Sequence, residues 1–178
     1  IGIVRISGSE ALEIADRVYK GKETITEVPT HTIHYGHVMD GDETVDEVLV
    51  MVMRGPRTFT GEDTVEINCH GGTYVVSRVL ETVLTAGARP AEPGEFTKRA
   101  FLNGKMDLSQ AEAVIDVITS ENEYALQSSI SQLKGSVKNR IKEIREKIIY
   151  HTAFIETALD DPEHISVDGY GEVLKEAA

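Results

Sequence analysis

The spacing of apolar and polar residues over the first hundred positions predicts strands interleaved with two helices. Residues 64–69 alternate strictly, with Val65, Ile67 and Cys69 on one face, as expected for a strand packed on a core. Elsewhere β-branched runs indicate three more strands, and apolar residues three and four positions apart indicate helices. The expected strands are 1–6, 31–39, 44–53 and 64–69, and the expected helices are 11–18 and 75–84.

Turn and capping residues mark the ends of these elements. Residues 40–42 (Asp-Gly-Asp) favour a tight turn, so the strands on either side are expected to form an antiparallel hairpin. Ser7 and Glu10 have the spacing of a capping box before the first helix, and Thr73 is the expected cap of the second. Strands and helices in this order are typical of a small α+β domain.

The second half of the chain has only helical periodicity. Residues 108–118 form one amphipathic segment, which Asp107 is placed to cap. An apolar stripe then runs through residues 126–159, which as one helix would be roughly 50 Å long. Gly135, in its middle, costs about 1 kcal/mol relative to alanine and favours a kink or a break there, and Pro162 ends the run. We expect part of a helical bundle whose other members lie beyond residue 178.

Composition and charge limit the classes of function expected for the chain. The chain has 178 residues, of which 40 % are hydrophobic, enough for a real core. No apolar stretch approaches the ~18 residues of a membrane helix, and no charged-then-apolar leader is present, so we expect a cytoplasmic protein with no membrane contact. Eighteen basic and thirty acidic residues give a net charge of −12, which opposes binding of RNA by this chain alone.

Motifs for nucleotide chemistry are missing from the sequence. The pattern G-x-x-x-x-G-K-[ST] occurs nowhere, and no G-x-G-x-x-G follows a predicted strand. These loops need their glycines for steric reasons, so we assign no catalytic residue and expect no GTP hydrolysis by this chain.

The histidines do not predict a metal site. His31, His34 and His37 recur every three residues, but in a strand His34 faces away from the other two. Cys69, the single cysteine, is expected in the core. Residues 70–72 (His-Gly-Gly) suit either a tight turn or an anion contact at a helix start.

Two lone charges stand within apolar strands. A bare charge is costly to desolvate, so Arg5 and Glu66 need an explanation. Either they pair with each other across the sheet, or both line a pocket, where Arg5 meets a carboxylate and Glu66 accepts two hydrogen bonds. The pattern does not decide between these. Without further information, Lys105 is typical of an ordinary loop lysine.

Five strings, in order and in register, resemble the amino-terminal part of the tRNA-modification GTPase family MnmE, also called TrmE. They are Gly2–Gly8, Phe59–Asp63, Glu66–Gly72, Pro93–Asn103 and Lys105–Ala113. The resemblance implies a tetrahydrofolate-binding α+β fold with a small mixed sheet and helices, followed by a partial all-α bundle. It divides the chain into residues 1–103, for folate binding and dimerisation, and residues 104–178, the first part of a helical domain.

The resemblance also implies a ligand and partners. The family binds 5-formyltetrahydrofolate or a related reduced folate, and its folate contacts fall on Arg5, Glu66 and Lys105. It forms homodimers and, with an MnmG-like flavoprotein, modifies carbon 5 of the tRNA wobble uridine. Its GTP, K⁺ and Mg²⁺ requirements belong to a GTPase domain for which this chain has no motif.

The chain departs from the family pattern in three ways, and two alternative functions compete with the one that the resemblance implies. The family's opening strand and the GTPase domain are absent, and Asp161 stands where the family usually has phenylalanine. One rival is a folate-dependent one-carbon transferase, which would need its own acid or base on a second domain. The other is a structural dimerisation module without a ligand, in which Arg5 and Glu66 simply pair.

Overall fold

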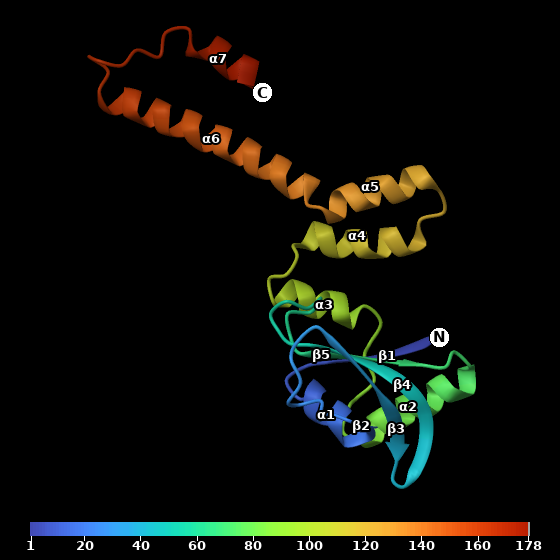
Figure 1. Cartoon of the computed structure of the whole chain (residues 1–178). Helices are drawn as coiled ribbons and strands as arrows, with labels where there is room; N and C mark the ends of the chain where they lie inside the picture. The colour runs from blue at the N-terminus through green and yellow to red at the C-terminus, as the bar shows by residue number, and fades with distance from the viewer. Residues whose placement is uncertain (178) are drawn as a thin grey trace. The chain divides into compact units, whose positions relative to one another are not determined.

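The computed structural model describes residues 1–177, and the chain divides into two compact units, Ile1–Met106 and Asp107–Ala178 (Figure 1). The first unit is a sheet with three helices, which confirms the α+β class. Its elements are β1 (Gly2–Ser7), α1 (Ala11–Val18), β2 (Tyr19–Gly21), β3 (Thr32–Asp40), β4 (Glu43–Met53), β5 (Thr64–Cys69), α2 (Thr73–Thr85) and α3 (Glu95–Leu102).

The sheet has the strand order β1-β5-β4-β3-β2. Each of these pairings is antiparallel, so within residues 1–177 the sheet is not mixed as the family resemblance implied. The expected hairpin is present, because Asp40 pairs with Glu43 across a turn that contains Gly41. Antiparallel neighbours need only short connections, and the link between β3 and β4 is such a turn.

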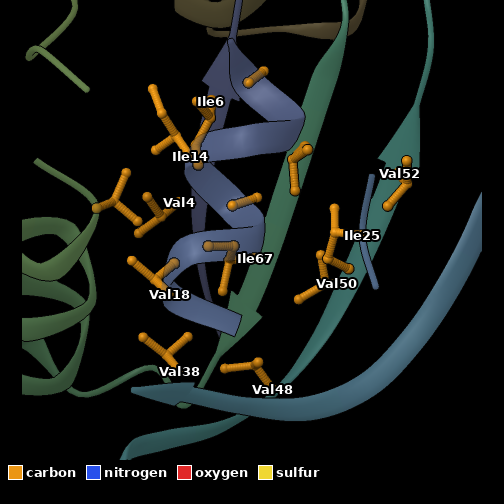
Figure 2. Packing of buried hydrophobic residues seen from close by; sticks show 14 of the residues in the cluster. Val4, Ile6, Ile14, Val18, Ile25, Val38, Val48, Val50, Val52 and Ile67 are labelled. Carbon is orange, nitrogen blue, oxygen red and sulfur yellow. The ribbon is translucent and has the colours of Figure 1, made fainter. Parts of the chain in front are cut away.

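One face of the sheet carries the core. The alternation of β5 turns Val65 and Ile67 to this face, where both are fully buried. Helices α1 and α2 cover it, with Ile14 on α1 and Val79 on α2 packed in the same cluster (Figures 1 and 2). Cys69 is buried there as a free thiol, as predicted.

The opposite face is covered at one end only. Helix α3 lies on this side of the sheet (Figure 1), and of its residues only Ala100 is fully buried. Farther along, Ile33, Tyr35 and Leu49 on β3 and β4 are all exposed. We call this side the open face, and its exposed apolar residues distinguish it from the packed side.

Two predicted caps are wrong. No side chain caps α1, because the Ser7 hydroxyl bonds to Thr60 Oγ1 (2.7 Å) instead of to the helix. The N-cap of α2 is Gly72, and Thr73 is already helical. The short elements β2 and α3 were not predicted.

Over its described residues, 107–177, the second unit contains four helices: α4 (Leu108–Thr119), α5 (Glu123–Leu133), α6 (Ser136–Asp160) and α7 (Tyr170–Ala177). The long apolar stripe is divided at Gly135, whose φ of 85° is left-handed and ends the helical hydrogen-bond ladder. Ile141 and Ile148 of α6 are each 60 % exposed. Within residues 1–177 no helix has both the length and the apolar character needed to cross a membrane.

Asp107 caps α4 as predicted. Its Oδ1 accepts from the Gln110 amide (2.9 Å) and from the Ser109 hydroxyl (2.7 Å), while Gln110 Oε1 accepts from the Asp107 amide (3.0 Å). These bonds, the one from the Gln110 amide above all, hold the pKa of Asp107 below its ordinary value of 3.8.

Replacing this cap tests its contribution. Asp107→Ala is expected to destabilise the helical unit by about 0.5–2 kcal/mol in thermal unfolding followed by circular dichroism. Because the folded-state pKa is depressed, the stabilisation is complete above the unfolded-state pKa and is lost as pH falls through the folded-state value. Asp116→Ala, which removes the same charge from the same helix without a cap, is the control. Equal effects at neutral pH would contradict the capping role.

Candidate functional site

Arg5 and Glu66 are brought together on the open face. Strands β1 and β5 pair with these two residues directly opposite each other, and alternation turns both away from the core. Arg5 Nε and Nη2 each lie 2.6 Å from Glu66 Oε1. The carboxylate is well shielded, with its side chain 15 % exposed, while the arginine side chain is 43 % exposed.

The pair uses only one oxygen of Glu66. Arg5 Nε and Nη2 both contact Glu66 Oε1. Glu66 Oε2 has no hydrogen-bond partner within the described chain. Because Arg5 is nearly half exposed, water screens the pair, which stabilises the fold by about 0.2–1 kcal/mol. The ion pair therefore contributes little to the stability of the fold. It leaves Oε2 of the shielded Glu66 side chain on the open face as a hydrogen-bond acceptor.

Helix α3 supports Arg5 from the side. The Phe96 ring lies under the guanidinium, with the Arg5 Cζ 5.6 Å from the ring centroid, a distance suited to a cation–π contact. Phe96 is the second residue of α3. The helix begins after Gly94, whose φ of 75° is left-handed. The Arg5 guanidinium thus contacts both Glu66 and the Phe96 ring.

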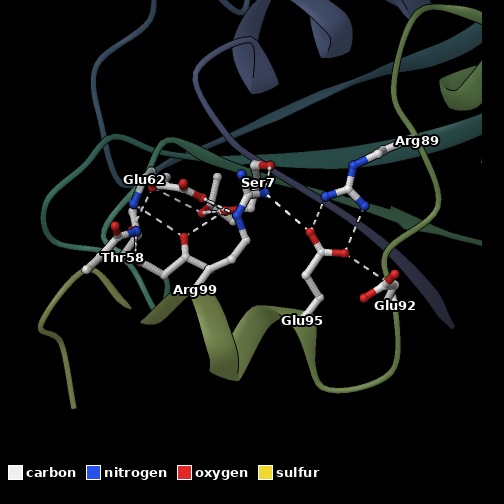
Figure 3. Close-up of polar contacts among 10 residues, drawn as sticks. Ser7, Thr58, Glu62, Arg89, Glu92, Glu95 and Arg99 are labelled. Atoms are coloured by element: carbon white, nitrogen blue, oxygen red, sulfur yellow. Dashed lines mark hydrogen bonds and ion pairs between the residues drawn. The ribbon is translucent and has the colours of Figure 1, made fainter. Parts of the chain in front are cut away.

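A polar network fixes α3 and the loop between β4 and β5 at the end of the site (Figure 3). Arg99 Nη1 donates to the Ser7 carbonyl (3.1 Å), and Arg99 Nε lies 3.2 Å from Glu62 Oε2. Ser7 Oγ bonds to Thr60 Oγ1, and Asn103 Nδ2 donates to the Thr60 carbonyl (2.8 Å). These bonds hold the backbone next to Arg5 and Glu66 in place.

The segment before α3 is held by an ion pair. Arg89 Nη1 donates to Glu95 Oε2 (2.9 Å), Arg89 Nη2 also contacts Glu95, and the Glu92 amide donates to the same carboxylate (2.9 Å; Figure 3). The Arg89 hydrogen bonds lower the pKa of Glu95 to about 2, so this carboxylate is ionised at neutral pH.

Lys105 stands apart from the other two predicted residues. Its Nζ donates to the Pro56 carbonyl (2.8 Å), and its stem packs against Gly61, where an added Cβ would lie 3.3 Å from the lysine Cγ and Cδ. No contact of Lys105 with Arg5 or Glu66 is present in the described residues. The lysine is held against the loop that leads into β5, through Pro56 and Gly61, ten and five residues before Glu66.

Comparison with known proteins identifies the family. Residues 1–105 match the family described as "GTP-binding protein TrmE N-terminus", and residues 108–178 match the "MnmE helical domain". A protein of Lachnoclostridium phytofermentans named tRNA modification GTPase MnmE is 56 % identical over 99 % of this chain and 39 % of its own length. One of Staphylococcus aureus strain JH9 with the same name is 54 % identical over 94 % of this chain and 37 % of its own length.

The chain belongs to the MnmE (TrmE) family. The resemblance found in the sequence is thereby confirmed. The chain spans about two fifths of the length of the curated MnmE relatives that it matches. Its two structural units correspond to the two matched regions, and the function of each unit remains a prediction.

Sequence reasoning missed several members of this MnmE site. Phe96 and Arg99 lie near Arg5 because α3 folds back over β1, and no periodic pattern announces that helix. Ser7 follows Arg5 on β1 itself. The available signal was indirect. The strings Gly2–Gly8 and Pro93–Asn103, quoted for the family resemblance, contain all three residues.

Most histidines of this MnmE chain form hydrogen bonds, whereas His37 makes an edge-on ring contact with Tyr35. No cluster of three or more potential metal ligands occurs among residues 1–177. His34 bonds to Glu23 (2.7 Å), and His70 Nδ1 lies 2.8 Å from Asp46 Oδ1. Burial of Asp46 favours its neutral form, but the His70 hydrogen bonds outweigh this and lower the pKa of the Asp46 carboxyl.

Proposed function

We propose that this MnmE-family segment binds a reduced folate, of the 5-formyltetrahydrofolate type, on the open face of its sheet. One observation carries the proposal: Glu66, shielded and ionisable, has one oxygen without a partner beside an arginine. A pterin ring presents an exocyclic amine and a ring N–H side by side, a two-donor edge that suits one carboxylate. Oε1 already accepts from Arg5, but each carboxylate oxygen has two lone pairs, so both can take part.

The cationic side chains assigned to the site suit the anionic tail of the folate. A folate ends in a glutamate, whose carboxylates favour guanidinium and ammonium groups. Arg5 and Lys105 are the cations that the family pattern assigns to the site, and Phe96 keeps Arg5 in place. We assign Glu66 to the pterin and Arg5 or Lys105 to an anionic part of the folate.

The wider proposal is that this segment belongs to a tRNA-modifying GTPase. Its relatives carry that name. In such an enzyme GTP, K⁺ and Mg²⁺ act at a separate GTPase domain, and tRNA and an MnmG-like flavoprotein join in the complete cytoplasmic assembly. The folate-bound segment then supports modification of carbon 5 of the wobble uridine.

The geometry favours this function over its rivals. An arginine that serves only as a counter-ion commonly bonds to both carboxylate oxygens as a fork, whereas both nitrogens of Arg5 meet one oxygen of Glu66. A one-carbon transferase would need its own acid or base near the ligand, and the chain continues into helices instead. The ligand-free module predicts no folate binding at all.

Calorimetric titration with 5-formyltetrahydrofolate separates these alternatives. We expect saturable binding to the 178-residue chain, and no measurable binding of p-aminobenzoylglutamate, which lacks the pterin that Glu66 recognises. Absence of folate binding at about 1 mM ligand, where even a free energy near −4 kcal/mol would be visible, would leave the structural module as the better account.

We further propose that the segment forms a homodimer. Several large apolar residues on the open face and along α6 are exposed, and large apolar surfaces commonly mark protein interfaces. A stable two-fold contact should bury more than roughly 1,000 Å². Sedimentation at tens of micromolar should give twice the monomer mass, and a monomer alone would refute the dimer.

A further inference from the structure

Asn68 lies on the same strand and the same face as Glu66. Both belong to β5, and side chains two residues apart in a strand point to the same side, about 7 Å from each other. The other neighbour of Glu66 on this face, Thr64, is buried and donates to the Glu62 carbonyl (3.3 Å). Asn68 is only half-buried, so it is the polar side chain of β5 that a ligand on Glu66 can reach.

A hydrogen bond to the main chain orients the Asn68 amide. Its Nδ2 donates to the carbonyl of Leu49 (3.3 Å), the residue directly opposite on the inner strand β4. A carbonyl oxygen only accepts, so the NH₂ end of the amide faces Leu49. The Oδ1 atom has no hydrogen-bond partner within residues 1–177, and Nδ2 keeps a second hydrogen. Asn68 therefore presents an acceptor next to a donor on the open face.

A reduced pterin has an edge that complements this amide. Beside the amine and ring N–H that we assign to Glu66, the ring carries N1, an acceptor, next to N8–H, a donor. An asparagine amide pairs with such an acceptor–donor edge through two parallel hydrogen bonds, as it does with adenine. In fully oxidised folic acid N8 has a lone pair and no hydrogen. Asn68 Oδ1 would then face a second acceptor.

We propose that Asn68 distinguishes reduced from oxidised folates by pairing with N1 and N8–H of the pterin. The inference rests on the proposed folate function, with Glu66 on the neighbouring edge of the same ring. The two residues are about 7 Å apart along β5, a separation that a fused two-ring ligand spans with one set of hydrogen bonds at each edge. Asn68 is thus a specificity-determining residue, whereas Glu66 recognises the part of the ring that all folates share.

Three ligands separate the two edges of the ring. 5-Formyltetrahydrofolate and 7,8-dihydrofolate carry N8–H and folic acid does not, while all three share the amine, the ring N–H and the glutamate tail. Calorimetry of the 178-residue chain should show dihydrofolate bound roughly 5- to 150-fold more tightly than folic acid. This is the usual effect of leaving a shielded acceptor without its donor.

Variants of the two residues should give different patterns with these ligands. Asn68→Ala should weaken binding of the two reduced folates by a similar factor and leave folic acid no weaker, so the preference disappears. Asn68→Asp should retain the preference, because a carboxylate still accepts from N8–H. Glu66→Ala is the matched control on the same strand. It should weaken all three ligands by the same factor and keep the preference.

The results that would overturn the role of Asn68 differ from those against folate binding itself. If the wild type binds dihydrofolate and folic acid equally, or if Asn68→Ala weakens all three ligands equally, Asn68 does not recognise N8–H. A lower melting temperature of Asn68→Ala with an unchanged ligand preference would show that the residue only joins β5 to β4. If the wild type binds none of the three ligands, the proposed folate function fails, and the role of Asn68 fails with it.

Discussion

Glu66→Ala is expected to weaken binding of 5-formyltetrahydrofolate by roughly 30- to 3,000-fold. Removing one member of a shielded, charged hydrogen-bonded contact typically costs about 2–5 kcal/mol, and 1.4 kcal/mol corresponds to a factor of ten in affinity. The carboxylate is 15 % exposed, and its unpaired oxygen offers the acceptor that the pterin edge needs. Calorimetry of the purified variant measures the loss.

A matched control distinguishes this effect from a general loss of charge. Glu47→Ala removes a carboxylate from β4 that bonds to the Tyr35 hydroxyl and not to Arg5, and it should bind folate like the wild type. The Glu66 variant should also keep its melting temperature within a few degrees, because the screened pair contributes little stability. Unchanged folate affinity in Glu66→Ala would end the assignment. A large loss of stability would show that the residue mainly neutralises Arg5.

Ile67→Ala is expected to destabilise the first unit by about 2–5 kcal/mol, the cost of removing a large buried side chain and leaving a cavity. Ile67 is fully buried on the inner strand β5, next to α1 (Figure 2). Such a loss is a large part of the stability of a small domain. Urea unfolding followed by circular dichroism measures it.

Ile33→Ala provides the comparison, because it deletes the same atoms from a strand position that is 60 % exposed on the open face. Its effect should stay below about 1 kcal/mol, in line with exposed positions generally. If the two variants lost equal stability, the division of the sheet into a packed and an open face would be wrong.

The regular elements were predictable because burial imposes a period on the sequence. Thr64–Cys69 alternates since one face meets the core, and the α2 stripe repeats because one side of the helix packs. The break at Gly135 followed from the cost of glycine within a helix. Helix α3 escaped prediction because it lies over the edge of a sheet with a single fully buried residue, Ala100, and so has no stripe.

The site was predictable only in part. Arg5 and Glu66 are lone charges in apolar strands, which indicated that each needs an electrostatic partner. The register of β1 and β5 places the two residues opposite each other. The sequence carries no information on which carboxylate oxygen Arg5 uses, since that depends on side-chain torsions. The Ser7 hydroxyl shows the same limit. Its spacing to Glu10 favours a helix cap, but a nearer partner, Thr60, belongs to a loop more than fifty residues away.

The bond between Lys105 Nζ and the Pro56 carbonyl makes any anion contact of this lysine an exchange reaction. The ammonium group gives up one acceptor as it gains another, so the net free energy is the difference between two hydrogen bonds and falls well short of a full ion pair. Lys105 should therefore contribute less to affinity than Glu66. Its departure also releases a constraint on the loop that leads into β5, so occupancy of the ligand site would be communicated to that loop as a change in its freedom.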